Sequence, residues 1–477
     1  MMRPITKNVI AIFTSDLFNR ILSFVALAYL ARVLGSGGFG KISFALAIFS
    51  YSFIAINFGL LTIGVREVAK DRARAPEYVG NIFGLRLVLG TLVFGVVILL
   101  TSLVPRLHSL QSIIILYHLA LFSFIFYLDW LFQGIEAMAS VGYSNIIMPL
   151  VYLVLVILFV RNKSEINLVP LFWFCGTVAG TVFLLAVYRL RVGKLGISFR
   201  FSAWKEILRS ALPLGLGRIC AEITRHFPIV IVGFLKSDQE IGYFSAATKL
   251  VYLVLIVDRI LFVVLLPVLS RYFTESIEKV KGLLSDLCKL AGIIILPLAF
   301  GCSALAPVIT NSVYGRDYGP GVILLRILIW FFALTVLNTI YCCALIAANQ
   351  ERKYALNIFI SMLVHLTSVT VLTVLFGMVG TALSVVIAEA ASLGLMYVRF
   401  RPTYDVRFWR YLPKPFLAAA VMGLVVYFAF PHNIFLSFFI GAAVYGLIMM
   451  LIRGISRRDV TNLQRIFSLD IRKCRES

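Results

Sequence analysis

Charged residues are scarce in this sequence of 477 residues. Asp, Glu, Lys and Arg make up only 14% of it, whereas soluble domains contain ~25%. Hydrophobic residues make up 61%, and the mean hydropathy is +0.97. This composition excludes a water-soluble globular fold. It predicts an all-α integral membrane protein, because the apolar residues suffice for roughly a dozen or more spans of ~20 residues.

Acidic residues are half as numerous as basic ones. The chain has 22 Asp and Glu against 44 Lys and Arg, which gives a net charge of +22. In a soluble protein this excess would indicate a nucleic-acid partner. In a membrane protein, basic residues instead collect in the segments on the cytoplasmic side of the bilayer. We therefore predict membrane lipid as a partner and no nucleic acid.

The sequence also lacks the patterns of a metal, disulfide or catalytic site. The seven cysteines contain no CxxC pair, and six of them lie in or beside apolar runs. The five histidines are scattered, and we interpret each as a packed or interfacial residue. No nucleophile–base constellation is present, so we expect no cofactor, no metal and no enzymatic activity.

A glycine-rich segment imitates a nucleotide-binding motif. Residues 35–41 fit GxGxxG and most of GxxxxGK, but Ile42 replaces the Ser or Thr that would bind magnesium. The segment lies between two apolar runs instead of between a strand and a helix. We interpret it as a tight glycine turn between two helices, so the chain has no ATP site of its own.

Fourteen apolar runs are long enough to span a bilayer. They lie near 8–31, 42–63, 80–104, 112–133, 143–160, 168–188, 211–234, 242–268, 284–309, 321–347, 355–376, 379–398, 414–430 and 434–452. We interpret the first run as a retained helix, because it is too long for a signal peptide and contains Asp16 and Arg20.

The distribution of Lys and Arg predicts the orientation. With both termini in the cytoplasm, the inside segments contain about 29 basic residues and the outside loops about 7. This ratio agrees with the positive-inside rule. The connection 189–210 and the basic tail should therefore be cytoplasmic, and the loop 161–167 should lie outside.

A short internal repeat divides the chain. Gly40-x-x-Ser43-x-Ala45 aligns with the motif that begins at Gly242, at an offset of 202 residues. Six spans separate the two copies, so both halves have the same orientation, as in parallel transporter repeats with a substrate site at their interface. We predict six-helix bundles at 1–200 and 201–410, a terminal helix pair at 411–453 and a basic cytoplasmic tail at 454–477.

Eight basic and six acidic residues lie within the predicted spans, where charge is costly and marks function. The basic ones are Arg20, Arg86, Arg218, Arg225, Lys249, Arg259, Lys289 and Arg326. The acidic ones are Asp16, Asp129, Glu222, Asp258, Asp286 and Glu389. The embedded excess of positive charge indicates an anionic ligand.

The seventh span carries the densest group of charges. Arg218, Glu222 and Arg225 have the spacing i, i+4, i+7, which places them on one helical face, with a kink expected at Pro228. They are either a self-neutralised cluster buried between helices or a cationic strip that lines a cavity. We favour the strip, with Arg20, Arg86, Arg259 and Lys249 as further substrate-binding candidates. Glu222, Asp258 and Asp16 are candidates for coupling to a proton or sodium ion. We favour Glu222 among them, because it shares a face with two arginines near the expected kink, although it could equally be a permanently paired carboxylate.

Several short motifs resemble one family. They are Tyr29-Leu30-Ala31-Arg32-Val33-Leu34-Gly35, Asn57-Phe58-Gly59, Arg66-Glu67-Val68-Ala69-Lys70, Asp129-Trp130 with Phe132-Gln133-Gly134, Ala211-Leu212-Pro213-Leu214-Gly215 and Gly242-Tyr243-Phe244-Ser245. Together they resemble the Wzx-type O-antigen and polysaccharide flippases of the multidrug/oligosaccharidyl-lipid/polysaccharide exporter superfamily. The resemblance implies two bundles around a V-shaped central cavity.

The resemblance also implies a function. It implies translocation of undecaprenyl-pyrophosphate-linked oligosaccharide, such as an O-antigen unit, across the bacterial inner membrane by alternating access. Polysaccharide polymerase and glycosyltransferases are the expected protein partners. The alternatives are a flippase for a peptidoglycan lipid precursor, a multidrug or cation antiporter, and, from another class, a membrane-embedded polymerase or glycosyltransferase. The short outside loops disfavour an enzyme, and the positive embedded charge disfavours cationic drugs.

Overall fold

The computed structural model describes residues 4–193, 195–404, 406–429 and 434–454, and these form helices without any strand. Long apolar runs are expected to form helices in a bilayer. Hydrocarbon offers backbone N–H and C=O groups no hydrogen-bond partner, so these groups must pair within the segment. Nine helical segments of the described chain are long and apolar enough to cross a membrane, and Pro413–Ala429 and Phe435–Leu451 are shorter apolar helices. The all-α, multi-pass membrane fold is confirmed, whereas the number fourteen stays a prediction.

Two of the longest helices are divided by a glycine. Helix α1 (Pro4–Asn57) contains Gly35 with φ 67°, and α14 (Glu351–Tyr404) contains Gly377 with φ 60°. This left-handed region favours glycine, which has no Cβ. Each long helix is therefore two consecutive helices. The divisions lie where the sequence predicts boundaries, between 31 and 42 and between 376 and 379.

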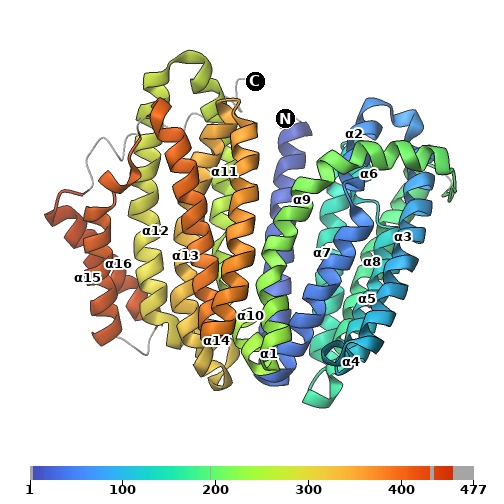
Figure 1. Ribbon diagram of the computed structural model, residues 1–477, viewed down its shortest axis with the longest axis horizontal. Coiled ribbons are helices and arrows are strands. Elements are labelled where there is room, and N and C mark those ends of the chain that lie inside the picture. The colour runs from blue at the N-terminus through green and yellow to red at the C-terminus, as the bar shows by residue number, and fades with distance from the viewer. Residues whose placement is uncertain (1–3, 194, 405, 430–433, 455–477) are drawn as a thin grey trace. The chain divides into compact units, whose positions relative to one another are not determined.

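The chain forms two compact units, Met1–Ala246 and Ala247–Ser477. After α1, the first unit contains α2 (Leu60–Lys70), η1 (Arg72–Arg74), α3 (Ala75–Leu103), α4 (Pro105–His108), α5 (Gln111–Ile125), α6 (Asp129–Gly134), α7 (Met138–Phe159), η2 (Lys163–Asn167), α8 (Leu168–Arg191), α9 (Phe201–Leu235) and the start of α10 (Asp238–Val254). Within it, α1 packs against α5, α7 and α9, and α8 packs against α5 and α7 (Figure 1).

The second unit continues α10 and contains α11 (Ile256–Glu275), α12 (Ile277–Tyr314), η3 (Arg316–Gly321), α13 (Val322–Ala347), α14, η4 (Phe408–Arg410), α15 (Pro413–Ala429) and α16 (Ile434–Leu451). Here α13 packs against α11, α12 and α14, while α15 packs against α12 and α16. The units divide inside α10, so the division of the bundles at residues 200 and 201 remains a prediction. Most of the predicted basic tail lies outside the described residues.

Helix α9 begins earlier than the seventh predicted span. Its first turns belong to the connection 189–210, and Figure 1 shows that this part of α9 runs across neighbouring helices before the helix turns along them. Trp204, Ile207 and Ala211 are buried in a cluster with residues of α2 and α3, whereas Lys205 and Arg209 are exposed. The polar composition of this segment therefore belongs to an amphipathic helix instead of a loop.

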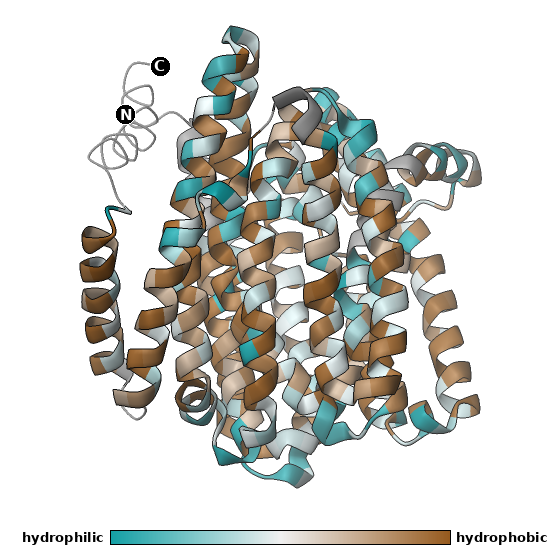
Figure 2. Cartoon of the chain, turned by 60° about the vertical axis from the view of Figure 1, so that its left-hand side comes forward, coloured by the Kyte–Doolittle hydropathy of each residue, from teal (hydrophilic) through white to brown (hydrophobic). Residues whose placement is uncertain are grey.

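Large apolar side chains are exposed along the outer faces of the helices. Leu92, Leu99 and Leu103 on α3 and Phe435 and Phe439 on α16 are examples. Figure 2 shows hydrophobic residues along the lengths of the helices and hydrophilic ones gathered near many helix ends. Soluble proteins rarely leave such extensive apolar surface uncovered, so these faces are suited to lipid.

Candidate functional site

A pocket of about 170 Å³ lies between α1 and α9 in the first unit. Its α1 side carries the aromatic rings of Phe49 and Phe53, with Phe58 just after the end of α1, and its α9 side carries Glu222 and His226. One wall is thus apolar and the other ionisable. This combination is typical of ligand sites, in which apolar area provides contact and a few polar groups fix orientation.

Glu222 is the centre of the polar wall. Its Oε2 lies 3.6 Å from Nη1 of Arg225 and 3.7 Å from Nε2 of His226. Both partners come from the next turn of α9, since residues at i+3 and i+4 share a helical face. The Arg225 side chain is 57% exposed, against 24% for Glu222, so the guanidinium has room to bind a ligand while it stays near its carboxylate.

Tyr51 ties the two walls of the pocket together. Its hydroxyl donates a hydrogen bond of 3.2 Å to the carbonyl oxygen of Ile223 on α9. Its ring also meets that of His226 edge-on, with centroids 6.4 Å apart. The position of Glu222 and His226 relative to α1 is therefore fixed by a contact that combines a ring and a hydrogen bond.

Arg20 and Asp16 lie on the part of α1 that precedes Gly35. Nε of Arg20 donates to Oδ2 of Asp16 over 3.3 Å, and the two side chains are 35% and 30% exposed. They form the predicted i, i+4 pair. Both residues are partly accessible, but neither belongs to the lining of the pocket between α1 and α9.

Arg86 has a different environment. It is 1% exposed, and its Nη1 donates to the carbonyl oxygens of Phe124 at 3.4 Å and Tyr127 at 3.1 Å. These carbonyls lie where α5 ends and the chain passes to α6, within the fourth predicted span. The helical hydrogen-bond pattern is interrupted there, and Arg86 supplies donors to the carbonyls. This placement favours a structural role over a role in the pocket.

The second unit contains its own buried polar cluster, formed by α11, α13 and α14. Nδ2 of Asn338 donates to Oε1 of Glu389 at 2.8 Å and to Oγ of Ser392 at 2.9 Å. Asp258 hydrogen-bonds Thr339 and interacts electrostatically with Glu389. One Asp258 oxygen and the Asn338 carbonyl oxygen are buried without a hydrogen-bond partner. These groups provide carboxylate, amide and hydroxyl oxygens, which can hold a proton or a small hard cation.

The remaining predicted site residues are distributed between the two units. The side chain of Arg218 lies outside the described residues. Lys249 and Arg259 belong to the second unit, where Arg259 is exposed and Lys249 is partly buried. Of the predicted substrate-binding residues, Arg225 is the one whose described surroundings include the polar wall of the pocket.

The sequence alone does not predict two residues of the pocket region, His226 and Tyr51. His226 is interpreted from the sequence as a packed or interfacial residue, and Tyr51 is not singled out. The spacing of His226 from Glu222, i+4, could have indicated a shared face. Nothing in the sequence pairs Tyr51 with α9, because that contact joins residues 172 positions apart.

A second pocket of about 200 Å³ lies between α2, α3 and the first turns of α9. Arg66 and Arg74 line it, but Arg66 pairs with Glu67 at 2.8 Å and Arg74 with Glu77 at 3.5 Å. These arginines already have carboxylate partners nearby. The pocket between α1 and α9 combines ionisable groups with aromatic rings, and we take it as the candidate site for that reason.

Solved structures of other membrane proteins share this fold. The chain superposes on "Lipid II flippase MurJ, inward closed conformation" with a TM-score of 0.74, covering 92% of this chain and 98% of that one at 15% identity. A multidrug MATE transporter in an inward-facing conformation gives a TM-score of 0.66 at 14% identity, covering 81% and 94%. At such identities the likeness shows the fold alone. It is the same multi-pass, all-α fold that these two membrane proteins have.

The sequence then identifies the family. Residues 5–273 match the family of polysaccharide biosynthesis proteins, and the chain belongs to that family. A "Putative O-antigen transporter" of Escherichia coli (strain K12) is 26% identical over 415 residues, covering 82% of this chain and 96% of the relative. A "Probable low-salt glycan biosynthesis flippase Agl15" of Haloferax volcanii is 20% identical over 476 residues, covering 97% and 99%. The resemblance stated from the motifs is confirmed.

Proposed function

We propose that this chain is a flippase that moves undecaprenyl-pyrophosphate-linked oligosaccharide, an O-antigen or other surface-polysaccharide unit, from the cytoplasmic to the periplasmic leaflet. The observation that carries this proposal is the pocket of the first unit, where Glu222 and His226 of α9 lie opposite aromatic residues of α1. Arg225 lies beside this lining and pairs with Glu222. Family membership and the names of the relatives support a glycan substrate.

The chemistry of the pocket suits such a substrate. Arginine presents a planar set of donors that binds phosphate oxygens bidentately. Aromatic faces such as Phe49 and Phe53 offer apolar area for contact with a ligand. We propose Arg225 and Arg218 as diphosphate-binding residues, with Arg20 as a further contact. Lys249 and Arg259 remain candidates in the second unit, whereas Arg86 is a weaker one because backbone carbonyls already bind its guanidinium.

The transport cycle proposed is alternating access, with both termini in the cytoplasm of a bacterial cell. A charged glycan head group cannot cross hydrocarbon unaided. A site exposed first to one side and then to the other avoids that barrier. A proton or sodium ion bound at Glu222, Asp258 or Asp16 would alter the charge of the site and thereby its affinity for diphosphate. Asp258 gains support from the neighbouring oxygens of Asn338, Thr339 and Glu389.

The proposed function is tested with purified protein in proteoliposomes. Lipid-linked oligosaccharide is placed in one leaflet, and its appearance in the other is measured with a membrane-impermeant glycosidase. We expect transport that depends on the protein. Parallel vesicles receive a peptidoglycan lipid precursor or a cationic dye. Transport of the precursor or the dye without transport of the oligosaccharide would replace the proposal with the corresponding alternative.

The same vesicles test the enzymatic alternative. A polymerase or glycosyltransferase would lengthen the glycan, which mass spectrometry of the extracted lipids detects. We expect the glycan to be recovered with its mass unchanged. A longer glycan formed only in the presence of the protein would contradict the transporter assignment.

A further inference from the structure

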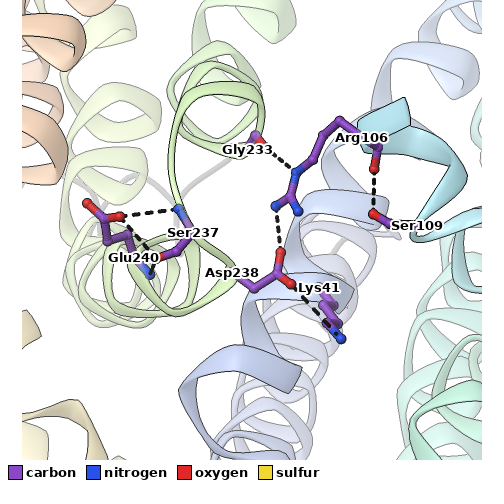
Figure 3. A network of polar contacts seen from close by, with 7 residues as sticks. All are labelled: Lys41, Arg106, Ser109, Gly233, Ser237, Asp238 and Glu240. Atoms are coloured by element: carbon purple, nitrogen blue, oxygen red, sulfur yellow. Dashed lines mark hydrogen bonds and ion pairs between the residues drawn. The ribbon is translucent and has the colours of Figure 1, made fainter. Parts of the chain in front are cut away.

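An ion-pair network joins four helices of the first unit at the turn between α9 and α10. Asp238, the first residue of α10, accepts a hydrogen bond of 2.5 Å from Nη2 of Arg106 on α4 (Figure 3). Its other oxygen lies 4.0 Å from Nζ of Lys41 on α1. Nε of Arg106 donates to the carbonyl oxygen of Gly233, near the end of α9, at 2.7 Å. One carboxylate and one guanidinium thus connect α1 and α4 to the α9–α10 turn.

The surroundings hold the two central groups in place. The Arg106 guanidinium lies 5.6 Å from the centroid of the Phe44 ring, and the hydroxyl of Ser109 donates to the Arg106 carbonyl oxygen at 2.9 Å. The side chains of Arg106 and Asp238 are only 27% and 23% exposed. Charge-assisted hydrogen bonds that are partly shielded from water are stronger than exposed surface pairs.

Glu240, the other acidic residue in the first turn of α10, hydrogen-bonds to the neighbouring Ser237. Glu240 accepts hydrogen bonds from the backbone N–H of Ser237 at 3.2 Å and from its hydroxyl at 3.0 Å. This arrangement caps the start of α10 (Figure 3). Asp238 and Glu240 therefore offer a matched pair of carboxylates, one joining helices and one capping its own.

The positions of these residues in the chain indicate on which side of the membrane the network lies. Lys41, Arg106 and the α9–α10 turn all lie in connections that the sequence predicts to be outside. Resting on the proposed function, we infer that Asp238, Arg106 and Lys41 form a latch, called here the outer latch. It holds the outer ends of α1 and α4 against the α9–α10 turn while the site faces inward, and it opens when the site faces outward.

The outer latch should shift the equilibrium between the inward-facing and outward-facing states. Contacts formed in one state and absent in the other shift the populations of the two states by their free energy. Arg106, with two short hydrogen bonds, should contribute most, and Lys41, at 4.0 Å, should contribute least. Loss of the Arg106–Asp238 pair should raise the population open to the outside roughly tenfold.

The latch is tested first in the empty protein. Spin labels are placed at His108→Cys on α4 and Gln239→Cys on α10, two exposed positions, with the native cysteines replaced by alanine. Distances are measured by electron–electron double resonance in nanodiscs. We expect a short distance in the parent. Asp238→Asn should raise the long-distance population roughly tenfold, and the control Glu240→Gln should not. Equal distributions for Asp238→Asn and the parent would overturn the latch, as would equal effects of the two substitutions.

A charge exchange distinguishes loss of the ion pair from misfolding of a single variant. Arg106→Asp combined with Asp238→Arg restores the ion pair with opposite polarity. We expect the double variant to return part of the population to the short distance, whereas each single variant stays open. The return is partial because the introduced arginine lies near Lys41 and the introduced carboxylate cannot donate to the Gly233 carbonyl. A double variant that remains as open as the single ones would contradict a role for the pair itself.

A cross-link then connects the latch to transport. In the cysteine-free background, Lys41→Cys and Asp238→Cys are joined by a short thiol-specific reagent that a reductant cleaves. We expect transport of lipid-linked oligosaccharide to stop on cross-linking and to return on reduction. Undiminished transport by fully cross-linked protein would refute the latch and leave the proposed function intact. Absence of transport by the parent would refute the function, while the distance measurement still decides the latch.

Discussion

Gly40 and Gly242, the first residues of the two copies of the internal repeat, lie against each other's helices where α1 crosses α10. A Cβ atom on Gly40 would overlap the carbonyl oxygen of Asp238 and lie 2.9 Å from the backbone nitrogen of Gly242. A Cβ on Gly242 would overlap the carbonyl oxygen of Ser36. The repeated glycine thus serves one physical purpose in both copies, because it lets the two backbones approach closely, as small residues do between membrane helices.

The first prediction concerns this crossing. Gly40→Ala and Gly242→Ala should each lower stability by about 1–3 kcal/mol, because backbone atoms cannot move aside as a flexible side chain can. Thermal unfolding in detergent measures the effect. Gly95→Ala on α3 is the matched control, since its Cβ meets no atom within 4 Å. It should be neutral or should stabilise by up to about 1 kcal/mol through helix propensity. Equal losses at Gly40 and Gly95 would contradict the close approach.

The second prediction separates a structural arginine from a binding one. Arg86→Ala should reduce the yield of folded protein and lower stability by about 2–3 kcal/mol, because two buried carbonyls lose a charged donor. Arg86→Lys should recover only part of the loss, since an ammonium lacks the planar donors. Thermal unfolding and the amount of monodisperse protein measure both effects. An Arg86→Ala protein of parental stability that binds diphosphate less tightly would show that Arg86 is a ligand instead.

The third prediction concerns Arg225. Because its side chain is 57% exposed and its pair with Glu222 spans 3.6 Å, Arg225→Ala should change stability by less than about 1 kcal/mol. It should nevertheless reduce transport at least roughly tenfold through loss of a charged phosphate contact. Arg225→Lys should restore part of the rate. Arg189→Ala, an exposed arginine at the end of α8, is the control. Full transport by Arg225→Ala, measured at equal protein level, would remove Arg225 from the site.

Much of the architecture could be predicted from the sequence, for physical reasons. A bilayer requires helices of apolar residues, so composition and run length predict the all-α fold. The divisions at Gly35 and Gly377 follow from glycine between two apolar runs. The break between α5 and α6 could not be predicted from such a glycine between apolar runs. At this break Arg86 donates hydrogen bonds to carbonyls that lie 38 and 41 residues further along the chain.

The candidate site was predictable only in part. Periodicity places Glu222 and Arg225 on one face of α9, and the structure has them 3.6 Å apart. The presence of charge within a span makes both Arg86 and Arg225 substrate-binding candidates, although Arg86 is buried among carbonyls and Arg225 is exposed. Burial depends on which helices pack together, and one sequence does not specify these contacts. The Asn338–Glu389 hydrogen bond joins residues 51 positions apart and is invisible to local patterns for the same reason.

The fourth prediction tests the orientation of the chain. Reporter fusions within 189–210 and after residue 454 should score cytoplasmic, because basic residues accumulate in these segments. A fusion at Lys163, in the short η2 helix between α7 and α8, should score periplasmic. The measurement compares an alkaline phosphatase fusion with a fluorescent-protein fusion at each position. A cytoplasmic score at Lys163 would reverse the predicted topology and would place the outer latch on the inner side.

The fifth prediction concerns the coupling ion. Asp258 lies within a cluster of oxygens in the second unit, whereas Glu222 lies 3.6 Å from the guanidinium of Arg225 and 3.7 Å from the His226 ring. A carboxylate between basic side chains gains little from a bound cation, because they already compensate its charge. The contacts described for Asp258 are with the Thr339 hydroxyl and the Glu389 carboxylate, which leave a bound cation more charge to neutralise. We therefore expect Asp258→Asn to abolish the dependence of transport on an imposed proton or sodium gradient, and Glu222→Gln to keep it at a lower rate.

Proteoliposomes with each gradient imposed separately decide between the two carboxylates. Glu389→Gln should weaken the gradient dependence without abolishing it, because Glu389 retains its position beside Asn338. If Glu222→Gln alone removes the dependence, the coupling residue lies in the pocket of the first unit, where the substrate diphosphate itself would compete with the ion. If neither gradient alters transport by the parent, the oligosaccharide moves down its own concentration difference. The oxygens around Asp258 would then stabilise the second unit without binding an ion.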